Sequence, residues 1–507
     1  MLIKRLLLPL FAVGLFGLST PGNAAVASVD YVHATILELK DVTVPVQMVG
    51  GGTNYSIPVS LKYFMRQIDK ANEVLNGTAT TNYAGALTTA QETNLVEVNR
   101  ARADIEALIE GPSAPSYPSF SVYLSGISAN DSFNFQMSAV GDFNIDWGDG
   151  STIETVTRTN TTNTVYSYTY PSAGNYTVTI YGLVTGYTTD SYTAAISFGY
   201  QTGYDKITGI SNTLSDIFPT LGNINGQQPR FYNTFGGCRY ITGSIPSGLF
   251  SNISGTPATF MFCQTFSNCS GLTTIPSNLF SGIISAPVEY LFYQTFSGCT
   301  EVTAIPSGLF SSISGAPELC MFAYTFSNCR TVSAIPSGLF SGIFGAPAQA
   351  MYNGTFSGCI NITSSIPHGL LGTISGAAAK SMFESTFGSC SKLSGSIPSG
   401  LFGTITGMLV EGMFRNTFNG CVSLTGIEDG IWDLTGMLNQ SEVPINMVNE
   451  IYRTFYNCSG ITSAPPTIAA GNPTMLWEKF TIKRQSPFYG AVNMQGYNDI
   501  PVDWKST

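Results

Sequence analysis

Apolar residues recur about every thirty positions along the second half of the chain. The segments that begin at Thr265, Thr295 and Thr325 are TFSNCSGLTTIPSNLF, TFSGCTEVTAIPSGLF and TFSNCRTVSAIPSGLF. Each has a Thr-Phe pair, a Cys, a further apolar residue, an Ile-Pro pair and a closing Leu-Phe pair. Self-similarity at a fixed period predicts stacked repeats, in which each unit buries its apolar face against its neighbours.

A cysteine marks the same place in each of eight units. Successive cysteines are 30 or 31 residues apart, except for a last interval of 37. We expect a solenoid over 201–465, closed by a C-terminal cap at 466–507. The eight positions are Cys238, Cys269, Cys299, Cys329, Cys359, Cys390, Cys421 and Cys458.

Within one unit, the spacing of apolar residues predicts a short helix and then a short strand. Ser285 can cap a helix with Pro287 in its first turn, ahead of apolar residues at i, i+3, i+4 and i+8. The segment 301–305, EVTAI, predicts a strand. The apolar residues of the predicted helix are Val288, Leu291, Phe292 and Phe296, and those that face inward from the strand are Val302 and Ile305.

We interpret the eight repeat cysteines as small buried apolar residues. Equivalent residues of adjacent parallel strands lie about 4.8 Å apart and point the same way, whereas a disulfide needs Cβ atoms that face each other at about 3.8 Å. Zinc is the alternative, but the chain has no C-x-x-C pair and only two histidines, His33 and His368. Cys263 and Cys320 fall outside the row, and we expect free thiols there or an intermolecular bond.

The pattern changes over 121–200, where polar and apolar residues alternate in short runs such as FNIDWGDG, TVYSYTY and NYTVTIYG. This alternation predicts a small β-sandwich. Asp149 and Gly150 are suited to a tight turn, because Gly accepts positive φ and the Asp carboxylate accepts bonds from nearby amides. A calcium site at Asp146 and Asp149 is the alternative.

Three further segments precede the sandwich. Residues 1–24 carry Lys4 and Arg5, an apolar run and small residues ending at Ala24, which predicts a secretory signal peptide; an anchor helix is the alternative. Residues 25–110 predict a strand and a helical hairpin, with an oligomerising coiled coil through 60–110 as the alternative. The Pro- and Ser-rich segment 111–120 predicts a linker. No later stretch is long and apolar enough to be a transmembrane segment.

Charge and motif content narrow the function classes. Only 10% of the residues are charged, and removal of the leader leaves 19 basic and 31 acidic residues, a net charge of −12 that repels nucleic acid. No G-x-S-x-G, H-E-x-x-H or G-x-x-x-x-G-K motif occurs. Carboxylates such as Glu301 and Glu384 occupy different places in their units, so no convergent catalytic pair is expected. We expect no enzyme, no cofactor and no metal.

Two sets of motifs resemble known families. The repeated TF-x-x-C-x-x-L-x-x-IP-x-x-LF pattern resembles the BspA-type leucine-rich repeats of bacterial surface proteins. Trp147, Gly148, Asp149 and Gly150, followed by Tyr170-Pro171 and the segment 174–178, GNYTV, resemble a PKD-type immunoglobulin-like domain. The resemblance implies an α/β leucine-rich repeat solenoid after an Ig-like β-sandwich. The last units depart from the pattern, with LTGIEDGIWDL after Cys421 and ITSAPPT after Cys458.

These features favour a secreted or cell-surface protein that presents an extended surface to a protein partner. Adhesion to host, matrix or other cells is what the family resemblance implies. Two alternatives stay open. One is a carbohydrate-binding module that uses the aromatic residues Phe260, Tyr290 and Tyr293, and the other is an oligomeric stalk component of the cell envelope.

Overall fold

The structure is a computed structural model that describes residues 118–507, apart from 212, 222–226, 285, 407–408, 435–444, 448, 483–484 and 507. The predicted leader, the predicted helical hairpin and most of the predicted linker lie outside the described residues. The chain divides into two compact units, Met1–Pro118 and Ser119–Thr507. The following description concerns the second unit.

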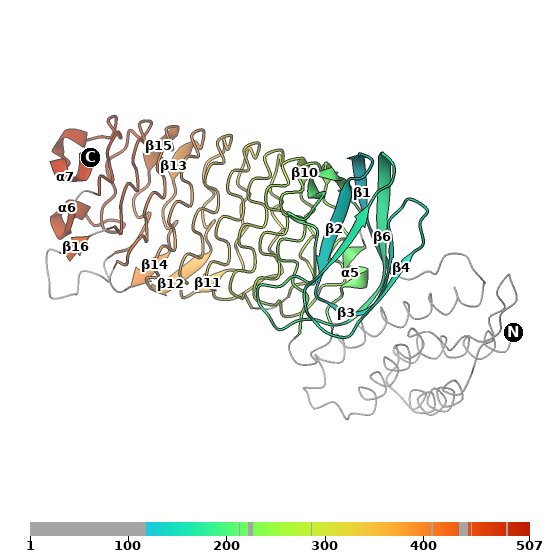
Figure 1. The fold of residues 1–507 in the computed structure, drawn as a ribbon. Helices are drawn as coiled ribbons and strands as arrows, with labels where there is room; N and C mark the ends of the chain where they lie inside the picture. The colour runs from blue at the N-terminus through green and yellow to red at the C-terminus, as the bar shows by residue number, and fades with distance from the viewer. Residues whose placement is uncertain are drawn as a thin grey trace, which may run out of the picture. The chain divides into compact units, whose positions relative to one another are not determined.

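Residues 119–210 form two antiparallel sheets around one apolar core (Figure 1). Strands occupy the segments in which polar and apolar residues alternate, so that every second side chain is buried: Phe133, Phe135 and Met137 from one strand, for example. The first sheet has the order β4-β3-β6-β1-β8 and the second β5-β2-β7. The strands are β1 Ser119–Ile127, β2 Ser132–Met137, β3 Val140–Asp146, β4 Glu154–Arg158, β5 Thr164–Thr169, β6 Gly174–Gly186, β7 Ile196–Ser197 and β8 Ile207–Ile210.

The end of this β region joins directly onto the first repeat. The N–H of Ala195 donates to the carbonyl of Arg230 at 2.8 Å, and the N–H of Phe198 donates to that of Thr234 at 2.8 Å. The ring of Phe198 stacks on Phe235 with centroids 5.8 Å apart. The β region therefore covers the apolar end of the repeat stack.

Each repeat forms one rung of a stack, and the rungs are joined by backbone hydrogen bonds. The N–H of Phe262 donates to Leu291 of the next rung at 3.1 Å, and the N–H of Phe266 donates to Thr295 at 2.9 Å. Between them, the N–H of Thr265 closes a tight turn onto the carbonyl of Phe262. The segment thus alternates between turns within a rung and bonds to its neighbour.

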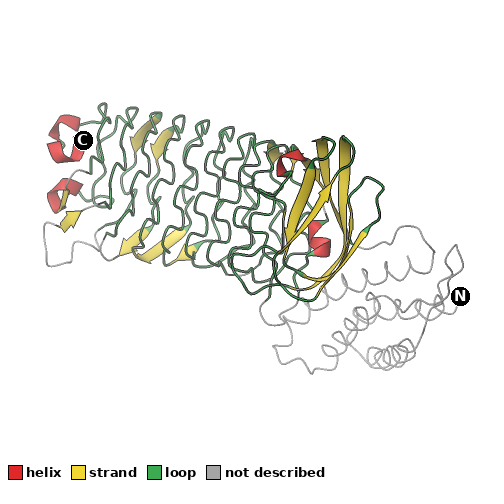
Figure 2. Ribbon diagram, in the orientation of Figure 1, coloured by secondary structure: helices red, strands yellow, loops and turns green. Residues whose placement is uncertain are grey.

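The prediction of an α/β leucine-rich repeat solenoid is wrong. The regular secondary structure of the second unit is mostly strands in small sheets, and the segments predicted to be helical are turns and loops (Figure 2). Every fourth residue there has a left-handed backbone, with φ of 63° at Phe260, 56° at Gln264 and 59° at Asn268, which an α-helix cannot contain. The described α-helices have four residues each: α5 Leu214–Ile217, α6 Leu476–Lys479 and α7 Val502–Lys505.

The strands of the repeats are short and pair in parallel with neighbouring rungs. The predicted strand at 301–305 is not one of them, although Val302 and Ile305 are buried. The parallel sets are β9 Gly243–Ser244 with β10 Leu272–Thr274; β11 Phe344–Gly345, β12 Thr373–Ala377 and β14 Thr404–Thr406; β13 Gly395–Ile397 with β15 Leu424–Ile427; and β16 Ile445–Met447 with β17 Phe480–Ile482. The 3-10 helices η1 Tyr204–Lys206 and η3 Tyr497–Asp499 lie outside these sets.

Equivalent side chains of the rungs stack into continuous rows in the core. The Phe of each Thr-Phe pair lies on its counterpart with ring centroids 5.4 to 5.9 Å apart. The row ends at Phe488, whose ring is covered by Trp504 at 6.2 Å. The Thr hydroxyls of the same pairs are buried and donate to carbonyls of the preceding rung at 2.8 to 3.0 Å. Both the apolar and the polar rows hold the rungs in register.

Candidate functional site

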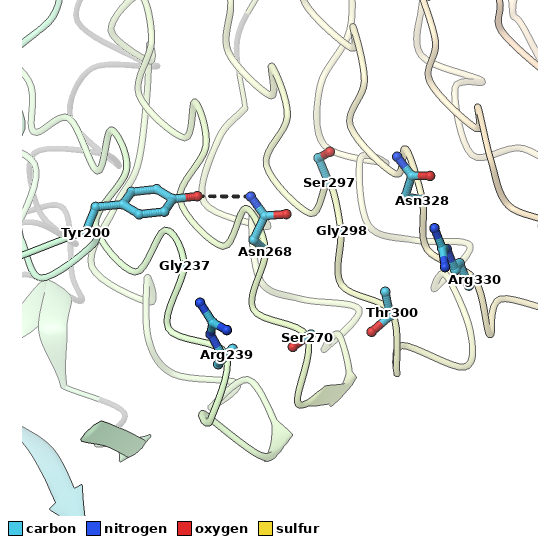
Figure 3. Close-up of a pocket in the computed structure, with 10 residues that line it drawn as sticks. All are labelled: Tyr200, Gly237, Arg239, Asn268, Ser270, Ser297, Gly298, Thr300, Asn328 and Arg330. Carbon is cyan, nitrogen blue, oxygen red and sulfur yellow. Dashed lines mark hydrogen bonds between the residues drawn. The ribbon is translucent and has the colours of Figure 1, made fainter. Parts of the chain in front are cut away.

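A polar groove of about 560 Å³ crosses four successive rungs beside the row of cysteines. Its lining comes from the residues just before and just after the cysteines of those rungs, and Tyr200 lies at one end (Figure 3). We call it the polar groove. It is lined by Tyr200, Gly237, Arg239, Asn268, Ser270, Ser297, Gly298, Thr300, Asn328 and Arg330.

The cysteines between these lining positions are buried in the core and do not line the groove. All eight predicted positions, from Cys238 to Cys458, are fully buried, and all ten cysteines of the chain are free. From Cys269 onward, each Sγ donates to the carbonyl of a Phe in the preceding rung at 3.0 to 3.2 Å. Burial raises the pKa of Cys299 to about 12, so the thiol stays neutral and keeps its proton for that bond.

The residue before each cysteine has a left-handed backbone, and this position shapes the groove. It is Asn268 in one rung and Gly298 in the next, with φ of 59° and 74°. A Cβ at Gly298 would lie 2.4 Å from Oδ1 of Asn268, and the same relation holds between Gly358 and Asn328. The Asn side chain of one rung therefore leans over a Gly of the next rung, which leaves room for both.

Tyr200 closes the groove at the first rung. Its ring lies against Gly237, where an added Cβ would be only 2.6 Å from the ring. Its hydroxyl accepts a hydrogen bond from Nδ2 of Asn268 at 2.9 Å (Figure 3). The side chain remains 53% exposed, so one end of the groove has an accessible aromatic ring.

Two guanidinium groups give the groove its charge. Arg239 and Arg330 each follow a cysteine, are exposed, and lie three rungs apart in the same row as Ser270 and Thr300. Within the described part of the chain, neither has a carboxylate partner within 4 Å, and no lining residue is acidic. Glu301 is exposed nearby but does not line the groove. The arrangement suits an anionic ligand.

The sequence did not point to these residues. The position after the cysteine is Arg, Ser, Thr and Arg in the four rungs of the groove, between strongly repeated neighbours. This variation at one place in an otherwise repeated unit is the signal that would have singled out Arg239 and Arg330.

The aromatic residues proposed for carbohydrate binding mostly cover one another. Phe260 is 8% exposed, and its ring stacks nearly parallel on Tyr290 with centroids 4.4 Å apart. The ring of Tyr192 is tilted against Phe260 with centroids 4.8 Å apart. The ring of Tyr293 makes T-shaped contacts with the rings of Tyr290 and Tyr324. A sugar needs a free ring face, and the buried ring of Phe260 offers little accessible surface for one.

The Trp-Gly-Asp-Gly turn lies between β3 and β4. Trp147 is buried, and its carbonyl accepts a hydrogen bond from the hydroxyl of Tyr170 at 2.9 Å. Gly148 and Gly150 have φ of 81° and 80°, and a Cβ at Gly148 would collide with the backbone of a neighbouring strand. Both positions therefore require the conformational freedom of Gly.

The carboxylates of this turn bond to the turn itself. Asp149 accepts from the N–H of Ser151 at 3.0 Å and from the hydroxyl of Tyr168 at 2.7 Å, and hydrogen bonds from these two residues lower its pKa. Asp146 accepts from the N–H of Gly148 at 2.8 Å. Across the described residues, no group of three or more His, Cys, Asp or Glu side chains is arranged to hold a metal ion.

None of the helices that the structure describes is long and apolar enough to cross a membrane. No family model, no curated protein and no solved structure matches this chain. The resemblances to BspA-type repeats and to PKD-type domains therefore stay predictions from the motifs.

Proposed function

We propose that the chain is a secreted, non-enzymatic binding protein that holds a protein partner at the cell surface, across several of its rungs. The observation that carries this proposal is the polar groove, in which side chains from four rungs and from Tyr200 line one continuous hollow. Secretion rests on the leader-like sequence of residues 1–24, and adhesion on the resemblance of the repeats to those of bacterial surface proteins.

The rigidity of the rungs supports binding at this groove. Buried Thr hydroxyls and stacked Phe rings fix each rung against the next, as in the bond from Thr295 to the carbonyl of Phe262 at 2.8 Å. Surface groups on such a frame lose little backbone entropy when a partner binds, because their backbone is already ordered. A preorganised surface binds more tightly than a flexible one of equal area.

A binding panel with the full secreted chain tests the proposal. We expect immobilised chain to retain at least one protein from a panel of purified extracellular matrix proteins. Asn268→Gly and Asn328→Gly remove groove amides while keeping a residue that accepts positive φ, and we expect the pair to weaken retention several-fold. Asn457→Gly is the matched control, since Asn457 has the same place in a rung outside the groove.

Two results would contradict the proposal. One is that the full chain retains none of the panel proteins at any salt concentration. The other is that the chain is found in the cytosol of its own cells, instead of on washed cells or in the medium.

A further inference from the structure

The two arginines of the polar groove are separated by three steps of the stack. Arg239 and Arg330 occupy equivalent places in rungs that are three steps apart. Parallel strands of one sheet lie about 4.8 Å apart. The stacked Phe rings of these four rungs have centroids 5.5 to 5.8 Å apart. Three steps therefore amount to about 14 to 17 Å along the stack. The positions between the two arginines carry Ser270 and Thr300, which are small and uncharged.

We propose that the polar groove binds an extended acidic segment of the protein partner, with carboxylates at positions i and i+4 that pair with Arg239 and Arg330. The inference rests on the proposed function and names the chemistry of the segment that the groove takes. The groove and its charges are observed, whereas the partner segment is inferred from their spacing.

The spacing matches an extended peptide. Such a chain rises about 3.4 Å per residue, and its side chains alternate between faces, so residues i and i+4 lie on one face about 14 Å apart. This lies within the separation of about 14 to 17 Å expected for the two arginines, whose long side chains can take up the remaining difference. Carboxylates at i and i+2 would be only about 7 Å apart, so that one of them would lie opposite Ser270 or Thr300 instead of a guanidinium group.

Charge complementarity favours carboxylates at these two places. A guanidinium group can donate two parallel hydrogen bonds to one carboxylate, and neither arginine is paired to an acidic residue within the described ranges. The chain as a whole carries a net charge of −10, which repels a diffusely acidic ligand. An acidic segment therefore gains most where its charges meet the arginines directly.

The side-chain amides of Asn268 and Asn328, which line the polar groove, provide acceptors for the peptide backbone. Nδ2 of Asn268 donates to Tyr200, and Nδ2 of Asn328 donates to Ser327 at 3.2 Å. No donor to Oδ1 of either side chain is found within the described residues, so both oxygens can accept from an N–H of a bound segment. Amide oxygens beside two guanidinium groups suit a peptide, which offers N–H donors and carboxylates together.

The test uses the full chain and labelled synthetic peptides of alternating Ser and Thr, measured by fluorescence anisotropy at low ionic strength. One peptide carries two Glu at i and i+4, a second carries them at i and i+2, and a third carries Lys at i and i+4. We expect the first to bind about threefold more tightly than the second, because an exposed charge pair typically contributes up to a few-fold in affinity. We expect no binding of the third.

Variants of the two arginines identify the contacts. Arg239→Gln and Arg330→Gln should each weaken binding of the first peptide about threefold, and together about tenfold, because sites this far apart act additively. Lys392→Gln removes a cation from a later rung outside the groove and should leave binding unchanged. Reversal of both charges, with Arg239→Glu and Arg330→Glu, should make the chain prefer the Lys peptide.

Several outcomes overturn the inference. They are no binding of any peptide, equal binding of the two acidic spacings, and no effect of the arginine variants. Arginine-dependent binding of polygalacturonate without binding of the peptides would replace the peptide with an acidic glycan. If a panel protein is retained and the asparagine variants weaken it, but the arginine variants do not, the proposed function stands and this inference fails. If no panel protein is retained while the peptides bind as expected, the proposed function fails.

Discussion

Substitution of Gly298 by Ala tests how the left-handed position of each rung is built. The new Cβ would adopt φ of 74° and lie 2.4 Å from Oδ1 of Asn268. Left-handed backbone costs a non-Gly residue about 1 to 2 kcal/mol, of which about 0.4 to 1 is offset by the lower entropy of the unfolded chain. Displacement of the Asn268 amide adds about 1 kcal/mol. We expect the free energy of unfolding to fall by about 2 kcal/mol.

Two matched variants separate these contributions. Gly369 has φ of 66°, and no atom lies within 4 Å of the position that an added Cβ would take, so Gly369→Ala should lower the free energy of unfolding by only about 1 kcal/mol. In a chain that already carries Asn268→Gly, the side-chain contact is gone, and Gly298→Ala should likewise lower it by about 1 kcal/mol. The coupling between Asn268 and Gly298 is then about 1 kcal/mol.

Urea unfolding of the full chain, followed by circular dichroism, measures these differences from the transition midpoints. Gly308→Ala provides a third reference, because Gly308 lacks positive φ and has only Ser311 near its Cβ position. Gly308→Ala should leave the free energy of unfolding unchanged or raise it slightly. Two results would refute the contact between Asn268 and Gly298. One is that Gly298→Ala and Gly369→Ala lower the free energy of unfolding equally. The other is that Gly298→Ala lowers it by the same amount with and without Asn268→Gly.

Three further predictions concern the buried rows and the capped end. Thr325→Val removes a buried hydroxyl whose single proton is shared between the carbonyls of Phe292 and Phe322, and it should lower the free energy of unfolding by about 1 to 2 kcal/mol in urea. The exposed Thr303→Val should leave it unchanged. Burial raises the pKa of Cys299 from its ordinary 9.0 to about 12, so on raising the pH the unfolded chain releases this proton before the folded chain does. The free energy of unfolding should therefore fall as pH rises from 9 towards 12, and it should fall less steeply in Cys299→Ala. Urea unfolding at each pH measures both slopes. Trp504→Ala uncovers the last ring of the Phe row and should lower the free energy of unfolding by about 3 kcal/mol and promote self-association in light scattering.

The repeat period and the positions of the buried residues could be predicted from the sequence, because stacking places equivalent side chains against one another. The helix could not be separated from a series of turns by apolar spacing alone. Apolar residues at i, i+4 and i+8, such as Phe292 and Phe296, fit a four-residue turn period as well as a helical one. The distinguishing signal lies elsewhere, at the residue before each cysteine. That residue is Gly, Asn or Ser in all eight units, which indicates positive φ and excludes a helix through that position.

The polar groove could not be predicted from the local sequence, since it depends on residues that only stacking brings together. Tyr200 belongs to the segment after β7, and Arg239 and Arg330 belong to rungs three steps apart, yet all three line one hollow. Local patterns describe one rung at a time. The groove depends on the regular offset between rungs and on side chains that differ from one rung to the next.

Residues that hold the stack together and residues that line the polar groove occupy neighbouring positions of the same turn. The cysteine is fixed by burial and by its bond to the preceding rung, and the residue before it is limited to those that tolerate positive φ. The residue after it is free of both constraints, because its side chain points to solvent, as with Arg239 and Arg330. Changes at that one position alter the charge of the groove without disturbing the stacked core. The repeat can therefore keep its fold while the residues after the cysteines vary from rung to rung.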